Sequence, residues 1–160
     1  MNMQITRKVQ IMIIIMALGL CYLGRIGYYK IFPRYSSFQN NDLITLMGND
    51  DIIIRQRAAN ELLNRGDKQI FIRALNNSND TIRETATHWL SSFNDPTLQP
   101  YLLKMLNDND LWVRKWACYS LGKIGNKESI IYLNKMSSDS SENVRNEARE
   151  AVEKIHKRDH

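Results

Sequence analysis

Four arginines recur at a nearly constant spacing and are the charged residues whose pattern most resembles a site. They are 28, 31 and 31 residues apart, and each follows an aliphatic residue and precedes an alanine three positions on. A ladder of guanidinium groups could bind anions through paired N–H donors. The same residues could instead tie structural units together, which is the interpretation we favour for Arg55, Arg83, Arg114 and Arg145.

A second candidate is a stripe of aromatic residues at helical spacing. Trp112, Trp116 and Tyr119 share one side of a helix, offset from the apolar side that carries Val113 and Ala117. The matching positions elsewhere in the chain are mostly polar, so the local pattern does not demand large rings there. Buried aromatic residues often dominate protein interfaces. The stripe, with nearby His88, is therefore a candidate partner-binding surface, and the alternative is internal packing against His88 and Trp89.

Residues capable of catalysis or metal binding occur without the spacing that either activity requires. His88, His156 and His160 show no ligand pattern, and Cys21 and Cys118 form neither a disulfide framework nor a metal motif. Cys118 and Ser120 lack a visible His–carboxylate partner, and no Gly-rich phosphate loop is present. We expect no catalysis, no metal, no cofactor and no small-molecule substrate.

The net charge of +5 is confined to one end of the 160-residue chain. Residues 1–34 contain five Lys or Arg and no acid, whereas residues 35–160 contain 17 basic and 17 acidic residues. A nucleic-acid-binding domain usually carries a basic excess of its own. We therefore expect no nucleic-acid partner.

Residues 9–24 form an apolar run flanked by Lys8 and Arg25. Extended to Tyr29, the run could cross a bilayer as a helix of about 31 Å, and it also fits a secretory signal. A weak lipobox before Cys21 leaves a lipidated, exported form as a further alternative. We expect a single-pass N-terminal membrane anchor in residues 1–34, a polar linker in residues 35–40, a repeat domain in residues 41–156 and a short tail in residues 157–160.

The elements that position these residues are predicted to be four helix pairs without strands. The second helices should begin after capping residues, and a Thr81–Glu84 capping box fits the second pair. We expect left-handed helix ends at Gly66, Asn94 and Gly125. The core faces of the last two second helices should carry Val113, Ala117, Leu121 and Ile124, and Val144, Ala148, Val152 and Ile155. The first helices should lie near residues 43–47, 70–75, 101–106 and 130–136, and the second helices should follow Asp51, Asp80, Asp110 and Ser141.

The recurring pattern Asp-x-x-(Val/Ile)-Arg-x-x-Ala-x-x-x-Leu-Gly resembles the HEAT-like repeats also found in phycobilisome lyases. The copy ending DLWVRKWACYSLGKIG fits it best. The resemblance covers about residues 41–156 and implies an all-α, right-handed α-solenoid of four HEAT-like helix pairs, preceded by the hydrophobic N-terminal segment. It also implies that the motif arginines pair with aspartates near them, such as Asp51, Asp80 and Asp110, and so play a structural role.

Such solenoids have diverse activities, and the fold alone does not choose among them. We expect a membrane-tethered scaffold or adaptor that binds a protein partner without catalysis. The alternatives are a lyase or chaperone-like cofactor handler, by analogy with the family, and a nucleic-acid-binding HEAT-like protein.

Overall fold

A computed structural model describes residues 35–158 of the chain. The chain divides into two compact units, Met1–Ser37 and Phe38–His160. In the first unit the structure describes one short 3-10 helix, η1 (Tyr35–Ser37). The membrane-anchor or signal helix expected in residues 1–34 lies outside the described residues. No helix within residues 35–158 has the length and apolar character needed to span a bilayer.

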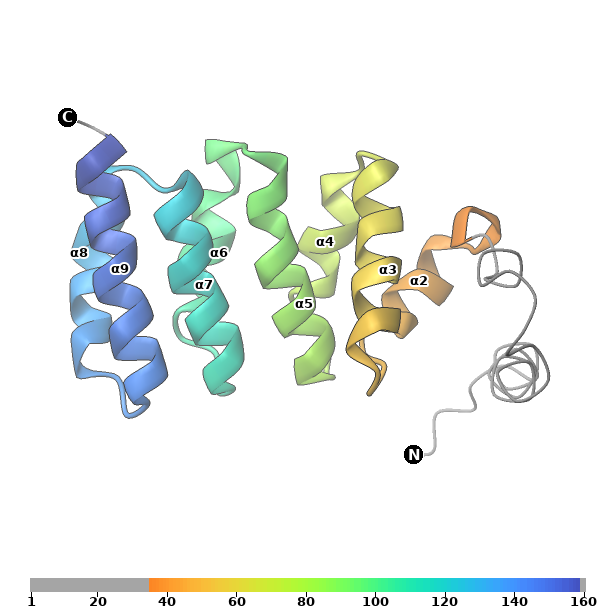
Figure 1. Ribbon diagram of the computed structural model, residues 1–160, viewed down its shortest axis with the longest axis horizontal. Helices are drawn as coiled ribbons and strands as arrows, with labels where there is room; N and C mark the ends of the chain where they lie inside the picture. Colours follow the sequence, from red (N-terminus) through yellow and green to blue (C-terminus); the bar gives the residue numbers. More distant parts are fainter. Residues whose placement is uncertain (1–34, 159–160) are drawn as a thin grey trace, which may run out of the picture. The chain divides into compact units, whose positions relative to one another are not determined.

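The second unit consists of four consecutive helix pairs, and no strand occurs within residues 35–158 (Figure 1). We call the pairs repeats 1 to 4. This confirms the all-helical repeat architecture expected from the sequence. The pairs are α2 (Asn40–Leu46) with α3 (Ile52–Asn64), α4 (Lys68–Ala74) with α5 (Asp80–Leu90), α6 (Gln99–Met105) with α7 (Leu111–Ile124), and α8 (Lys127–Lys135) with α9 (Glu142–Arg158).

The second helices of the pairs form one row in which α3 contacts α5, α5 contacts α7, and α7 contacts α9. The helices α4, α6 and α8 lie behind this row in Figure 1. Short 3-10 helices complete the connections: η2 (Ser91–Phe93), η3 (Pro96–Leu98) and η4 (Met136–Ser138). Each repeat thus buries its apolar faces against its neighbours, as stacked repeats must.

Helix caps confirm most of the expected starts and correct one. The side chain of Asp51 accepts a hydrogen bond from the Ile53 N–H (2.8 Å), and Asp110 accepts one from the Trp112 N–H (2.8 Å). Helix α5 instead begins at Asp80, with Asn79 as its cap. Thr81 therefore lies inside the helix, and the expected Thr81–Glu84 capping box was wrong. Asparagine caps helices as well as aspartate does.

Two of the three expected left-handed helix ends are confirmed. Gly66 has φ of 72° and Asn94 has φ of 49°. Gly125 is extended instead, with φ of −70° and ψ of 161°. A Cβ at Gly125 would lie 2.5 Å from the Leu121 carbonyl oxygen and 2.6 Å from the Ser129 Oγ. This glycine is thus required by close backbone packing, not by a left-handed turn.

The expected core is confirmed in α7 and needs one correction in α9. Val113, Ala117 and Leu121 are fully buried, and Ile124 is 5 % exposed. In α9, Val152 is only half-buried, because within the described residues no further helix packs beyond α9. The neighbouring Ala151 is buried in its place. It packs closely against α7, because a Cβ at Gly122 would lie only 2.9 Å from the Ala151 Cα.

Candidate functional site

Three of the four residues expected to form a partner-binding surface meet between α5 and α7. The His88 ring stacks on the Trp116 ring, with centroids 4.0 Å apart and an angle of 23° between the planes. Tyr119 contacts both rings edge-on, at 5.6 Å from His88 and 5.3 Å from Trp116. All three side chains are half-buried. They therefore join repeat 2 to repeat 3 and also face solvent.

Trp116 carries a further bond that fixes its indole ring. Its Nε1–H donates to the Glu84 carboxylate of α5 at 3.0 Å. The packing against His88 that the sequence offered as the alternative to binding is thus present. Trp89 contributes less, since its ring contact is with His88 at 6.0 Å.

Trp112, the fourth expected residue, is the most exposed of the set at 43 %. Lys115 links it to the cluster, because the Lys115 Nζ lies 5.3 Å from the centroids of both the Trp112 and Trp116 rings. Lys123 and Lys154 approach Tyr119 at 5.8 and 5.3 Å. Such cation–π contacts stabilise a ring and an ammonium group together. We call His88, Trp112, Trp116 and Tyr119 with these lysines the aromatic surface.

Burial and charge make the ionisable groups at this surface unusual. Burial, followed by the nearby Lys123 charge, lowers the pKa of His88 to about 4, so its ring is neutral at pH 7. Burial also raises the pKa of Glu147 in α9, and the Lys154 Nζ lies 3.8 Å from its Oε1. The aromatic surface therefore has a neutral, stacked centre bordered by lysines and acids.

Two arginines of the ladder form ion pairs between repeats, with partners other than those that the resemblance implied. Arg83 makes two parallel bonds to Asp108, both 2.9 Å long. Arg114 binds Asp139 in the same way, at 2.8 and 3.0 Å. The expected partners Asp80 and Asp110 lie instead at the starts of their helices. Each carboxylate comes from the following repeat, 25 residues downstream of its arginine. No local pattern in the sequence indicated a partner at this separation.

These ion pairs shift the pKa values of both aspartates downward. At Asp139 the leading cause is the hydrogen bond from Arg114. At Asp108 burial is the largest single cause and would raise the pKa, but the hydrogen bonds from Arg83 and the Asp110 N–H, with the charges of Arg83 and Arg114, outweigh it. The side chains in both pairs are at most 17 % exposed. They hold repeat 2 to repeat 3 and repeat 3 to repeat 4.

All four arginines also share an identical bond to their own loops. The Nη1 of each donates to the carbonyl oxygens six and five residues earlier, at distances between 2.7 and 3.2 Å. In the part of the chain that the structure describes, Arg55 and Arg145 have no carboxylate partner. Among the described residues, the two inner arginines therefore pair with carboxylates and the two outer ones do not.

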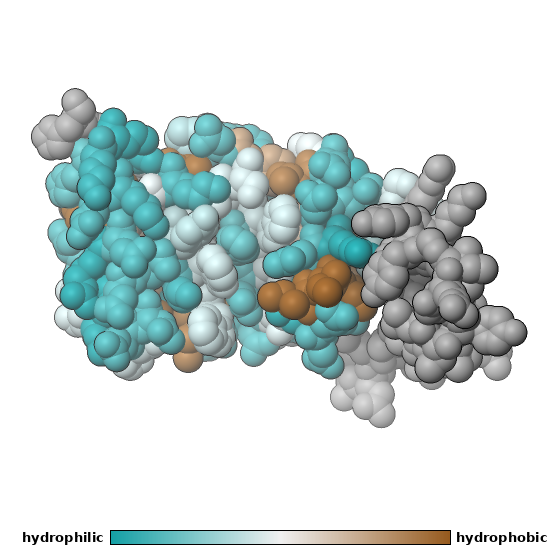
Figure 2. All heavy atoms as spheres, viewed as in Figure 1, coloured by the Kyte–Doolittle hydropathy of each residue, from teal (hydrophilic) through white to brown (hydrophobic). Residues whose placement is uncertain are grey.

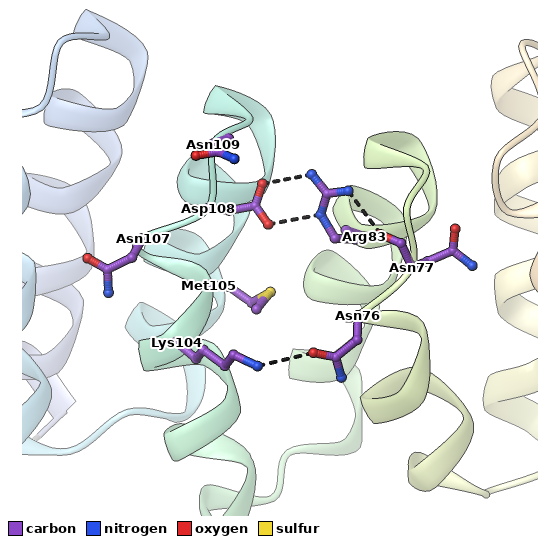
Figure 3. A pocket seen from close by; sticks show the side chains of 8 residues that line it. All are labelled: Asn76, Asn77, Arg83, Lys104, Met105, Asn107, Asp108 and Asn109. Atoms are coloured by element: carbon purple, nitrogen blue, oxygen red, sulfur yellow. Dashed lines mark hydrogen bonds and ion pairs between the residues drawn. The ribbon is translucent and has the colours of Figure 1, made fainter.

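A polar cavity of about 470 Å³ lies beside the Arg83–Asp108 pair (Figure 3). Lys104 crosses it and donates to the Asn76 Oδ1 at 3.1 Å. The lining was not anticipated from the sequence, because its residues come from two repeats. Because Arg83 and Asp108 neutralise each other, the polar groups left to contact a ligand in the cavity are side-chain amides and Lys104. This lining contains no acid–base pair suited to catalysis. The lining comprises Asn76, Asn77, Arg83, Lys104, Met105, Asn107, Asp108 and Asn109.

The nucleophilic side chains considered above are engaged in packing. Cys118 is fully buried, and burial followed by the charges of Glu147 and Asp139 raises the pKa of its thiol to about 12. Ser120 is also buried, and its Oγ donates to the Thr87 carbonyl oxygen at 2.9 Å. No group of three or more His, Cys, Asp or Glu residues within the described range could hold a metal ion.

A family model of HEAT repeats matches residues 69–153, more than half of the chain. The chain therefore belongs to the HEAT repeat family. The match spans most of α4 to α9 and leaves out the first helix pair. A comparison with the curated proteins finds no significant match.

Two solved structures share the fold. One is the complex of CpcE and CpcF of phycocyanin lyase from Nostoc sp. PCC7120, with 19 % identity and a TM-score of 0.59, covering 84 % of this chain and 59 % of that one. The other is an engineered protein from a structural genomics consortium, with 18 % identity and a TM-score of 0.54, covering 74 % and 62 %. The chain spans about 60 % of each. At these identities the similarity concerns the fold.

Proposed function

We propose that this chain is a protein-interaction scaffold whose aromatic surface binds a protein partner without catalysis. The supporting observation is the exposed Trp112, which Lys115 links to the stacked His88 and Trp116 rings and the edge-on Tyr119 ring. Interface hot spots are enriched in tryptophan and tyrosine that a rigid scaffold holds in place. HEAT repeats suit this role, because stacking leaves a long row of helices available for a partner.

The scaffold is proposed to be tethered to a membrane by residues 1–34. The support is the apolar run of residues 9–24 and the confinement of the excess positive charge to its flanks. On this proposal the full-length chain fractionates with membranes and resists carbonate extraction. A Cys21→Ser variant that detaches from the membrane would instead favour the lipidated, exported form.

The principal rival is a lyase or cofactor-handling role by analogy with the family. One structural neighbour is a phycocyanin lyase complex, and this chain shares its fold. Cys118, the cysteine within the repeats, is buried with its pKa raised to about 12. That environment supports a packing role, because covalent chemistry requires an accessible thiolate.

The decisive experiment separates binding from packing by using single substitutions at two tryptophans. Trp112→Ala should abolish partner capture while the unfolding free energy stays within about 1 kcal/mol of wild type, because surface changes are mild. Trp116→Ala should cost about 2–4 kcal/mol, since it removes the His88 stack and the Glu84 bond. The measurements are a thermal melt and a pull-down with the full-length chain, identifying captured proteins by mass spectrometry.

Tyr132 supplies the matched control for Trp112. It is 44 % exposed and has a lysine, Lys135, 5.5 Å from its ring, but it lies on α8 in the other row of helices. Tyr132→Ala should leave capture intact. Loss of capture in Tyr132→Ala with none in Trp112→Ala would place the partner on the opposite side and refute the proposed surface.

A further inference from the structure

Arg55 makes the same bonds to its own loop as the paired arginines, but within residues 35–158 it has no carboxylate partner. Its Nη1 donates to the carbonyl oxygens of Asn49 and Asp50 at 2.8 and 3.1 Å. This matches the bonds of Arg83 to its own loop, at 3.0 and 3.2 Å. Fixing one nitrogen in this way orients the remaining Nε–Nη2 edge, which is the edge that binds a carboxylate in a bidentate manner.

The missing partner is explained by one position in the loop of repeat 2. The residue six positions before each arginine accepts a backbone N–H two residues on: Asn77 from Asn79, Asp108 from Asp110, and Asp139 from Ser141, at 2.8–2.9 Å. At 108 and 139 the carboxylate also binds the arginine of the preceding repeat. Asn77 makes the backbone bond but has no charge to offer Arg55.

Two exposed aliphatic residues lie within three positions of Arg55 on the same helix. Ile52 and Ile53, in the first turn of α3, are 56 % and 55 % exposed. Ile52 precedes Arg55 by three residues and so shares its helix face. Figure 2 shows hydrophobic residues gathered over the α3 end of the repeats, whereas the rest of the visible face is mostly hydrophilic. An oriented cation beside exposed aliphatic groups matches a short peptide segment in both charge and hydrophobicity.

We propose that Arg55, with Ile52 and Ile53, binds an acidic side chain of a protein partner flanked by aliphatic residues. The partner's carboxylate takes the place that Asp108 and Asp139 occupy on Arg83 and Arg114. Residues 1–34 contain no Asp or Glu and cannot supply it. The exposed Asp50 and Asp51 repel a phosphate dianion more than a single carboxylate, which favours an acidic peptide over free phosphate.

The test uses the full-length chain and a defined peptide, acetyl-Ser-Leu-Glu-Leu-Ser-amide, with its glutamine counterpart as the neutral control. Binding is followed by the NMR signal of the Arg55 Nε–H, assigned by its loss in Arg55→Lys. The glutamate peptide should bind about tenfold more tightly than the glutamine peptide, because bidentate charged bonds are strong and specific. Equal affinities for the two peptides would overturn the proposal.

Two matched variants show whether the binding place is the one inferred. Asn77→Asp supplies an internal carboxylate and should weaken glutamate-peptide binding to the level of the glutamine peptide. Asn109→Asp makes the same change of charge beside Arg114, which already has a partner, and should leave binding unchanged. A similar weakening in both variants would show mere charge repulsion and refute the site.

Competing ligands and a failure of the proposed function are distinguished by three further measurements. Inorganic phosphate that binds Arg55 more tightly than the glutamate peptide, or self-association of the chain that Arg55→Lys abolishes, would each contradict the assignment. Trp112→Ala should leave peptide binding intact, because the aromatic surface lies on α5, α7 and α9 and includes no residue of repeat 1. The Arg55 site can therefore hold if the aromatic surface fails, and the reverse is equally true.

Discussion

The junction between repeats 1 and 2 lacks, within the described residues, the ion pair that joins the repeats at each of the two junctions that follow it. Repeats 2 and 3, and repeats 3 and 4, are joined by a bidentate Arg–Asp pair with bonds of 2.8–3.0 Å. Repeat 1 presents Arg55 in the same loop frame without a carboxylate partner in the described residues. The arginine bonds to the loop carbonyls thus occur within each repeat, whereas the ion pair requires two neighbouring repeats.

Repeat 1 also differs in sequence, since the HEAT repeat match begins at residue 69. Its second helix exposes Ile52 and Ile53, where repeat 2 has Asp80 and Thr81. Stacked repeats interact mainly with their neighbours. A terminal repeat that keeps the arginine bonds to its loop can therefore change its other residues and gain a new role with little loss of stability. The comparison predicts weaker coupling at the first junction, and the following substitutions test it.

The largest effect is expected from truncating the core leucine of each second helix. Leu121 in α7 and Leu62 in α3 occupy equivalent positions and are both fully buried. Leu121→Ala should cost about 2–5 kcal/mol through the cavity it opens. Leu62→Ala should register less in global unfolding, because a weakly coupled repeat 1 can open locally. Chemical denaturation and hydrogen exchange measure both, and equal global losses would contradict the weaker coupling.

The next effect concerns the arginines themselves. Arg114→Met should cost about 1–3 kcal/mol, because it leaves the mostly buried Asp139 carboxylate without its cation. Arg55→Met should cost less than about 1 kcal/mol, since only two loop carbonyls lose a donor. Urea denaturation of the two variants gives the difference directly. Similar costs would mean that the loop frame, not the ion pair, carries the stabilisation.

His88 gives the second junction a dependence on pH that the first should lack. Burial and Lys123 lower its pKa from 6.5 to about 4, so the folded state holds the proton less tightly than the unfolded chain. Its contribution to stability is complete above pH 6.5 and is lost as pH falls toward 4. We expect about 1–2 kcal/mol after allowing for solvent at this half-buried ring.

The His88→Asn variant checks this assignment, because repeat 1 has Asn60 at the equivalent position. The unfolding free energy of the variant, followed by denaturant titration at several pH values, should change less than that of wild type between pH 6.5 and pH 4. An unchanged slope in the variant would assign the dependence to other groups.

The sequence predicted the helix pairs and the α7 core because their period depends only on local burial. It also identified His88, Trp116 and Tyr119, which the repeat offset brings together. It could not identify Asp108 as the partner of Arg83, since that contact depends on how two repeats stack. The same limit applies to Gly125, where a Cβ would lie 2.6 Å from the Ser129 Oγ of the next repeat. The helix pairs and the core faces were predictable from spacing, whereas the ion-pair partners between repeats required the structure.

The smallest expected effect tests the comparison from the opposite direction. Asn77→Asp supplies the carboxylate that the first junction lacks and keeps the oxygen that accepts the Asn79 N–H. If the first junction stacks like the inner ones, Arg55 should pair with the new aspartate and stabilise the chain by about 0.5–1 kcal/mol. The gain should vanish in the Arg55→Met background and fall as pH drops through the aspartate pKa, because protonation removes the charge. A double-mutant cycle on thermal melts measures this coupling. A coupling of zero would show that repeats 1 and 2 meet at a different angle, so that one carboxylate alone does not account for the difference between the junctions.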